Sequence, residues 1–277
     1  MIYLILAILS SALVSLTMRF SEGKAPNRIA MLAVNYVCCA VLAALYTGGN
    51  LLVSGDGAGV TWGLGAVSGV MFLVSFLLLQ WNVHKNGVVL SSTFMKLGVI
   101  VPTVLAMTVF GERPRAVQLA GLVLAVAAIL IINLEKGQGR AQSGIGLLVL
   151  LLGGGMTDTL SKVYEQWGNA TMKSQYLLYT FVVAMALCTL LALYKHQRLT
   201  WTDVVCGLVI GVPNYFSARF LLLSLGNIPA VLAYPTYSVA TIVVVSLSGV
   251  LLFREKLSRR QMAGMGVILA AIALLNL

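Results

Sequence analysis

Three ionisable side chains lie inside long apolar stretches of the sequence. Lys96 and Arg219 are cations, and Asp158 is the only acid well inside such a stretch. A charge at the centre of a membrane helix costs about 2.5–3.5 kcal/mol on insertion scales, so its presence needs a reason. We predict that Lys96 and Arg219 contact an anionic group of a substrate and that Asp158 is a proton-coupling carboxylate.

Each of these predictions has a structural alternative. The cations can snorkel to a membrane interface or pair with an acid elsewhere in the bundle. Asp158 lies four residues before Lys162, so the two side chains share a helix face and are placed to form an internal ion pair. Such a pair would neutralise charge without any role in coupling.

Polar side chains at helical spacing extend the candidate site. Ser92 precedes Lys96 by one turn, Tyr215 precedes Arg219 by one turn, and Tyr234 and Ser238 share a face. The alternative for an individual hydroxyl is interhelical hydrogen bonding. The predicted substrate contacts are Arg219, Lys96, Tyr215, Ser92, Tyr234, Ser238 and Arg19.

Prolines lie close to both buried cations. Pro102 follows Lys96 by six residues, and Pro213 precedes Arg219 by six. A proline removes one backbone hydrogen-bond donor, so we expect locally broken helices beside these charges, as binding cavities in membranes often have.

The composition indicates an integral membrane protein. Of 277 residues, 60% are hydrophobic and only 9% are charged, whereas a soluble domain keeps about a quarter charged. This excludes a soluble enzyme, a disordered tail and a nucleic-acid-binding domain. The net charge of +10 comes from basic residues that lie mostly in short loops, which is typical of a membrane-orientation signal. We expect a multi-pass protein of the cell (inner) membrane.

The elements that must position these residues are ten apolar runs, each near the length of about 20 residues that a spanning helix needs. The fold class is therefore all-α, a polytopic bundle of ten transmembrane helices. The predicted spans are 2–20, 29–47, 60–81, 88–110, 116–134, 144–164, 174–194, 203–225, 229–253 and 260–277.

The chain also contains an internal repeat. A shift of 143 residues places 110–134 on 253–277 with ten identities in 25 positions. We predict a first five-helix repeat over 1–143 and a second over 144–277. Because five is odd, the two repeats would have inverted topology, an arrangement that secondary transporters use to open a central site to alternate sides.

Two loop motifs support a family resemblance. Phe110-Gly111-Glu112 and Phe253-Arg254-Glu255 each open a helix with Gln-x-x-Gly, at 118–121 and 261–264. With ten spans in two halves, the chain resembles the EamA-type transporters of the drug/metabolite transporter superfamily. The resemblance implies a secondary transporter of small metabolites, with a central cavity lined mainly by helices one, three, four, six, eight and nine. Arg254 departs from the usual Gly-Glu pair.

These observations favour a secondary transporter, an exporter or exchanger, of a small carboxylated or zwitterionic metabolite. The alternatives are a broad-specificity drug exporter and a flippase-like protein that handles lipid headgroups. We expect no enzymatic activity, cofactor or metal site. The expected partners are a small-molecule substrate and the lipid bilayer, but no nucleic acid. The sequence is also compatible with a homodimer.

The orientation of the bundle is ambiguous. Twelve Lys and Arg residues follow odd-numbered predicted spans and four follow even-numbered ones. The positive-inside rule therefore places the odd loops in the cytoplasm and both termini outside, while the family resemblance implies cytoplasmic termini. We favour the charge rule.

Overall fold

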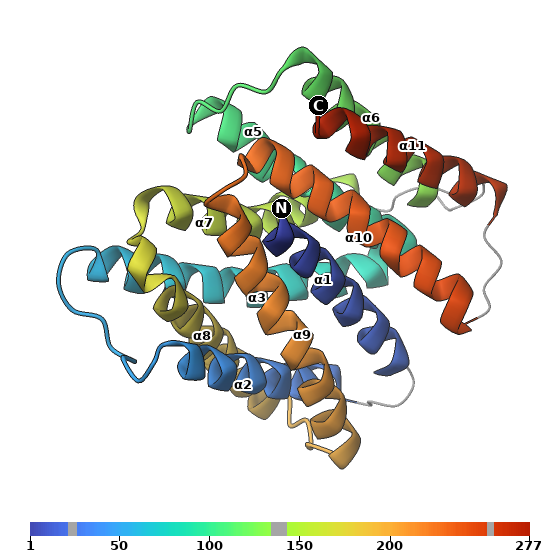
Figure 1. The fold of residues 1–277 in the computed structure, drawn as a ribbon. Helices are drawn as coiled ribbons and strands as arrows, with labels where there is room; N and C mark the ends of the chain where they lie inside the picture. Colours follow the sequence, from blue (N-terminus) through green and yellow to red (C-terminus); the bar gives the residue numbers. More distant parts are fainter. Residues whose placement is uncertain (22–26, 134–142, 254–257) are drawn as a thin grey trace. The chain divides into compact units, whose positions relative to one another are not determined.

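The computed structural model describes residues 1–21, 27–133, 143–253 and 258–277, and in these ranges every regular element is a helix (Figure 1). One 3₁₀ turn, η1, covers Ala170–Met172. The α-helices are α1 (Ile2–Ser21), α2 (Arg28–Tyr46), α3 (Ala58–Asn86), α4 (Val88–Leu97), α5 (Ile100–Thr108), α6 (Ala116–Asn133), α7 (Gly144–Trp167), α8 (Lys173–Tyr194), α9 (Trp201–Leu225), α10 (Ala230–Phe253) and α11 (Arg259–Leu275).

Each predicted span coincides with a helix to within a few residues, except the fourth, which is divided into α4 and α5. Within the described ranges, eight spans are long and apolar enough to cross a membrane, with α4 and α5 counted as one. The other two helices are α6 and α11. The predicted polytopic, all-helical class is confirmed at this level.

The expected helix break near Lys96 is present. α4 ends at Leu97 and α5 begins at Ile100, because Pro102 has no N–H to donate to the carbonyl of Gly98. That carbonyl accepts from the nitrogen of Val101 instead, at 2.9 Å. The break expected near Arg219 is absent, since α9 continues as a helix through Pro213.

Two compact units make up the chain, and neither coincides with a sequence repeat. Unit 1 comprises Met1–Leu73 and Val163–Gly226, and unit 2 comprises Val74–Lys162 and Asn227–Leu277. α3 and α7 contribute to both units. The two repeats follow one another in the sequence, whereas each compact unit combines helices from both repeats.

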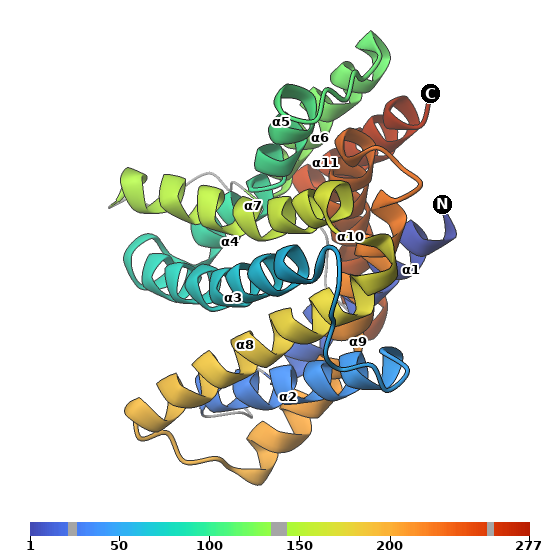
Figure 2. The ribbon, with the colours of Figure 1, turned by 90° about the vertical axis from the view of Figure 1, so that its left-hand side faces the viewer.

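In unit 1, α2 packs beside α8 and α9 (Figure 2). The nitrogen of Ala30 donates to Oε1 of Gln197 at 3.1 Å, and Nε2 of Gln175 donates to the carbonyl of Asn50 at 3.1 Å. The start of α2 therefore lies by the end of α8, and the chain just beyond α2 lies by the start of α8. Helices two and seven of the predicted bundle, which correspond in the repeat, are antiparallel.

In unit 2, α6 and α11 are a second corresponding pair that runs antiparallel. Gly121, early in α6, faces Leu275 at the end of α11, and Gly264, early in α11, faces Ile132 near the end of α6. The repeated Gln-x-x-Gly motif thus has a structural purpose. Its glycines let the helices cross closely, and its glutamines cap the helix starts by accepting from the nitrogens of Arg115 and Ser258.

Candidate functional site

Arg219 lies on α9 in a polar and aromatic environment within unit 1. Its Nη1 donates to the hydroxyl of Tyr215 at 3.1 Å and to Oγ of Ser174 at 3.2 Å. Its guanidinium carbon lies 4.1 Å from the centroid of the Tyr46 ring. These contacts hold the side chain in position. Because the side chain is only half-buried, part of it stays accessible.

Three helices bring these groups together. Tyr215 precedes Arg219 by one turn on α9, Tyr46 is the last residue of α2, and Ser174 is the second residue of α8. Tyr215 is fully buried, and its ring stacks on that of Tyr46 with centroids 5.7 Å apart. Phe216 packs edge-on against Tyr215, so aromatic rings continue from the cation along α9.

The charge of Arg219 has no counter-ion among the described residues. No described carboxylate lies within ion-pair distance, and its hydrogen bonds to side chains both use Nη1. A guanidinium carries five N–H donors in a rigid fork. The remaining donors are therefore open to a ligand, and a carboxylate matches their geometry.

Arg219 lies in the later half of α9, midway between the middle of the helix and its last residue. Arg219 is six residues from the last residue of α9, which is about 9 Å along the helix axis. This depth differs from the midplane position expected for a transporter site. It agrees with the positions of Tyr46 and Ser174 at helix ends.

Arg19, another predicted contact, lies at the opposite end of the same unit. α1 runs antiparallel to α9, because Tyr3 stacks on Phe220 while Thr17 and Trp201 line one groove. Sixteen residues separate Tyr3 from Arg19, about 24 Å along α1. A small molecule held by Arg219 does not reach Arg19 in this arrangement.

The other predicted contacts lie in unit 2. Lys96 is exposed near the end of α4, with no ion pair or hydrogen bond of its side chain to any described residue. Ser92 and Ser238 are half-buried. Tyr234 is fully buried and donates its hydroxyl proton to the carbonyl oxygen of Asp158 at 2.6 Å, which ties α10 to α7.

The ion pair with Lys162, given above as the structural alternative for Asp158, is not formed. Nζ of the buried Lys162 lies 3.0 Å from Oε1 of Glu112, and it also lies over the ring of Phe110. The carboxylate of Asp158 is half-buried and pairs with no described cation. Lys162 pairs with Glu112 and not with Asp158 because the carboxylate of Glu112 is already held in place. Its two oxygens accept from the nitrogens of Ala230 and Val231.

Through those bonds Glu112 caps the first turn of α10, where the helix dipole attracts an anion. It does not cap α6, the helix that follows it in sequence. Its repeat counterpart Glu255, with Arg254, lies outside the described residues.

Sequence reasoning missed two of the three partners of Arg219 and one contact between amide side chains. Tyr46 and Ser174 lie at helix ends, where tyrosine and serine are common and carry no periodic signal. Nδ2 of Asn214 donates to Oδ1 of the buried Asn35 at 3.2 Å, linking α9 to α2. Two amides within apolar runs were visible in the sequence and could have suggested this contact.

The four cysteines are free thiols. Within the described ranges, no three His, Cys, Asp or Glu side chains gather closely enough to hold a metal ion.

Comparison with known proteins identifies relatives of the chain. The family model described as Small Multidrug Resistance protein matches residues 165–268, which include Arg219 and all of α8, α9 and α10. The multidrug resistance protein EbrA of Bacillus licheniformis is 40% identical over 70 residues, which are 25% of this chain and 67% of that protein. An uncharacterised protein of Haemophilus influenzae is 24% identical over 214 residues, covering 74% of this chain and 72% of the relative.

A solved crystal structure shares the fold. It aligns with 99% of this chain and 94% of its own, with a TM-score of 0.75 and 14% sequence identity. The family-model match and the similarity to EbrA, together with the apolar helices, identify the protein as a multi-pass membrane transporter. Residues 165–268 match the small multidrug resistance family, and the chain belongs to the drug/metabolite transporter superfamily that contains this family.

Proposed function

We propose that the protein is a secondary transporter of a small organic carboxylate or zwitterion, an exporter or exchanger, and that Arg219 binds the substrate's carboxylate. One observation supports this most strongly. The guanidinium is held by two neutral hydroxyls and a ring, has no carboxylate partner among the described residues, and keeps donors open. A substrate carboxylate would supply both the missing charge and the missing acceptors.

The neighbours of Arg219 then have positioning roles. Tyr215 and Ser174 restrict the rotation of the side chain, and the Tyr46 ring supports it through a cation–π contact. Lys96 is the second proposed contact, because it is exposed and pairs with no described acid. Asp158 is proposed as the coupling carboxylate, since no described cation neutralises it.

Alternating access between two inverted five-helix repeats, in an EamA-type transporter of the inner membrane, completes the proposal. Its support is the antiparallel packing of corresponding helices, α2 with α8 and α6 with α11. Inverted repeats can exchange conformations and so open a site to either side in turn.

A broad-specificity drug exporter is the second candidate. The printed name of EbrA favours it, as do the rings of Tyr46, Tyr215 and Phe216, because aromatic faces attract organic cations. The position of Arg219 among those rings opposes it, since a permanent cation repels cationic drugs.

A ligand panel tests the proposal against this alternative. Purified protein is heated with small carboxylates, amino acids or lipophilic quaternary ammonium compounds. A ligand at 100 times its Kd stabilises by about 2.7 kcal/mol. We expect carboxylates to raise the melting temperature of the wild type but not of Arg219→Gln. Stabilisation by the ammonium compounds in both proteins, with none by carboxylates, would establish the exporter instead.

A further inference from the structure

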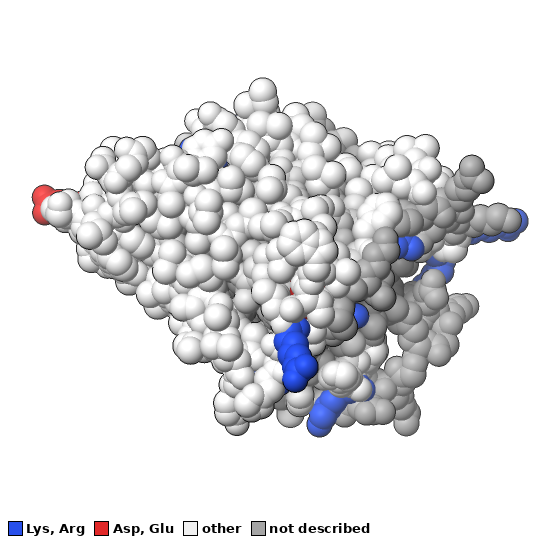
Figure 3. Space-filling model, turned by 90° about the horizontal axis from the view of Figure 1, so that it is seen from below, with Lys and Arg blue, Asp and Glu red and all other residues white. Residues whose placement is uncertain are grey.

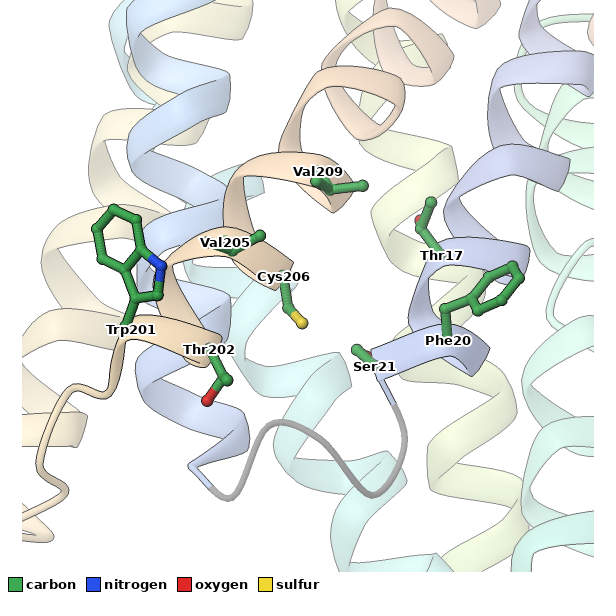
Figure 4. A pocket seen from close by; sticks show the side chains of 8 residues that line it. All are labelled: Thr17, Phe20, Ser21, Trp201, Thr202, Val205, Cys206 and Val209. Atoms are coloured by element: carbon green, nitrogen blue, oxygen red, sulfur yellow. The ribbon is translucent and has the colours of Figure 1, made fainter.

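A groove runs between α1 and α9 at the end of unit 1 remote from Arg219. Its volume is about 490 Å³ (Figure 4). Its lining comes from the last turn and a half of α1 and from the first half of α9. The lining residues are Thr17, Phe20, Ser21, Trp201, Thr202, Val205, Cys206 and Val209.

The groove is suited to hydrocarbon, although hydroxyl residues line it. The Thr17 hydroxyl donates to the carbonyl of Leu13 at 2.7 Å, and the Ser21 hydroxyl donates to that of Met18 at 2.6 Å. These donors are satisfied within α1, which leaves carbon atoms to face the groove. Val205 and Val209 are 41% and 51% exposed. A polar metabolite would therefore find few partners here.

Two arginines lie beside the helix starts at one end of the groove. Nδ2 of Asn27 donates to the carbonyl of Arg198 at 2.7 Å, and its nitrogen donates to Oδ1 of Asp203 at 3.3 Å. These bonds hold Arg28, at the start of α2, beside the start of α9. Arg28 and Arg198 are exposed. On the face drawn in Figure 3, blue side chains of Lys and Arg prevail over red ones.

One described acid also lies at this end, inside the protein. Asp203 is fully buried and accepts from the nitrogen and the hydroxyl of Thr200, as part of the capping box of α9. The exposed Trp201 next to it has the amphipathic character of a residue at the membrane interface. Exposed arginines thus lie beside the helix starts at this end of the apolar groove.

We propose that this groove binds an anionic phospholipid. One acyl chain lies along Val205 and Val209, and the headgroup phosphate contacts Arg28 and Arg198. From Trp201 to Val209 the groove follows α9 for about 12 Å. Charge complementarity favours this occupant, because anionic lipids attract basic residues near the membrane surface by about fivefold in affinity per cation.

Native mass spectrometry of the full-length protein tests the proposal with phosphatidylglycerol and phosphatidylcholine as probes. We expect the wild type to retain one phosphatidylglycerol in preference to phosphatidylcholine. Val209→Trp fills the groove and should lose the retained lipid. Leu190→Trp, on an exposed site of α8 outside the groove, is the matched control and should keep it.

A charge variant decides the matter if Val209→Trp fails to fold. Arg28→Gln with Arg198→Gln, both exposed, should reduce the preference for phosphatidylglycerol about fivefold per cation, while Arg113→Gln changes nothing. The proposal would be overturned if the wild type retained both lipids equally. It would also be overturned if the protein were detected as a dimer without bound lipid. Because Arg219 lies at the other end of α9, such a failure would leave the transport proposal intact.

Discussion

Nζ of Lys162 lies 3.0 Å from Oε1 of Glu112, and the same carboxylate caps the first turn of α10. One acid thus joins the α5–α6 connection, α7 and α10 within unit 2. The side chain of Lys162 is 6% exposed and that of Glu112 is 16% exposed, so water screens the pair only weakly. This contact fixes the start of α10, which carries Tyr234 and Ser238.

Removal of Glu112 should destabilise the protein strongly. Glu112→Ala removes the carboxylate that pairs with the buried Lys162 and leaves two N–H groups uncapped, so we expect a loss of about 3–5 kcal/mol. The double variant Glu112→Ala, Lys162→Met should lose less than the sum of the single variants. Thermal unfolding in detergent measures these effects, and Arg113→Ala, on the next residue, should stay within about 0.5 kcal/mol of wild type. Additive losses would contradict the pairing.

Two glycines of α11 provide a matched test of the close crossing with α6. A Cβ at Gly264 would collide with Cγ1 of Ile132, whereas one at Gly266 would meet nothing within 4 Å. Gly264→Ala should therefore cost about 1–3 kcal/mol, and Gly266→Ala should be neutral or slightly stabilising. The melting temperatures of the two variants check this, and equal values would refute the crossing.

Tyr46 should contribute to substrate affinity through its ring and not its hydroxyl. Tyr46→Phe keeps the cation–π contact with Arg219, so its Kd for a stabilising carboxylate should stay within about twofold of wild type. Tyr46→Leu removes the ring and should weaken binding about three- to fivefold. The Kd values come from the ligand dependence of thermal stabilisation. Equal weakening in both variants would assign the effect to the hydroxyl.

The orientation predicted by charge can be checked on unit 1 alone. The α8–α9 loop carries Lys195 and Arg198, and the loop after α2 carries Gly49. In a background without native cysteines, His196→Cys should react with a membrane-impermeant maleimide only after cell lysis, and Gly49→Cys in intact cells. The reverse pattern would place both termini in the cytoplasm, as the family resemblance implies.

The sequence predicted the helices well because hydropathy records burial in lipid directly. Ten apolar runs correspond to the observed helices, and Pro102 located the division between α4 and α5. Pro213 did not break α9, since packing around a proline decides whether the helix ends there.

The site was predicted less completely because helical spacing reveals only neighbours on the same helix. Tyr215 was found as a partner of Arg219 in this way. Tyr46 and Ser174 come from α2 and α8, so only the fold brings them to the guanidinium. The same limit explains the error at Lys162, whose partner Glu112 lies fifty residues away in sequence while Asp158 lies one turn away.

Uptake into proteoliposomes by Arg219 variants tests the central claim most directly. The substrate is the carboxylate that raises the melting temperature of the wild type most. Only variants whose melting temperature without ligand equals that of the wild type are assayed. We predict that Arg219→Gln reduces saturable uptake to background and that Arg219→Lys retains part of it with a raised KM, because an ammonium lacks the planar fork. Wild-type uptake with an unchanged KM in Arg219→Gln would contradict the account.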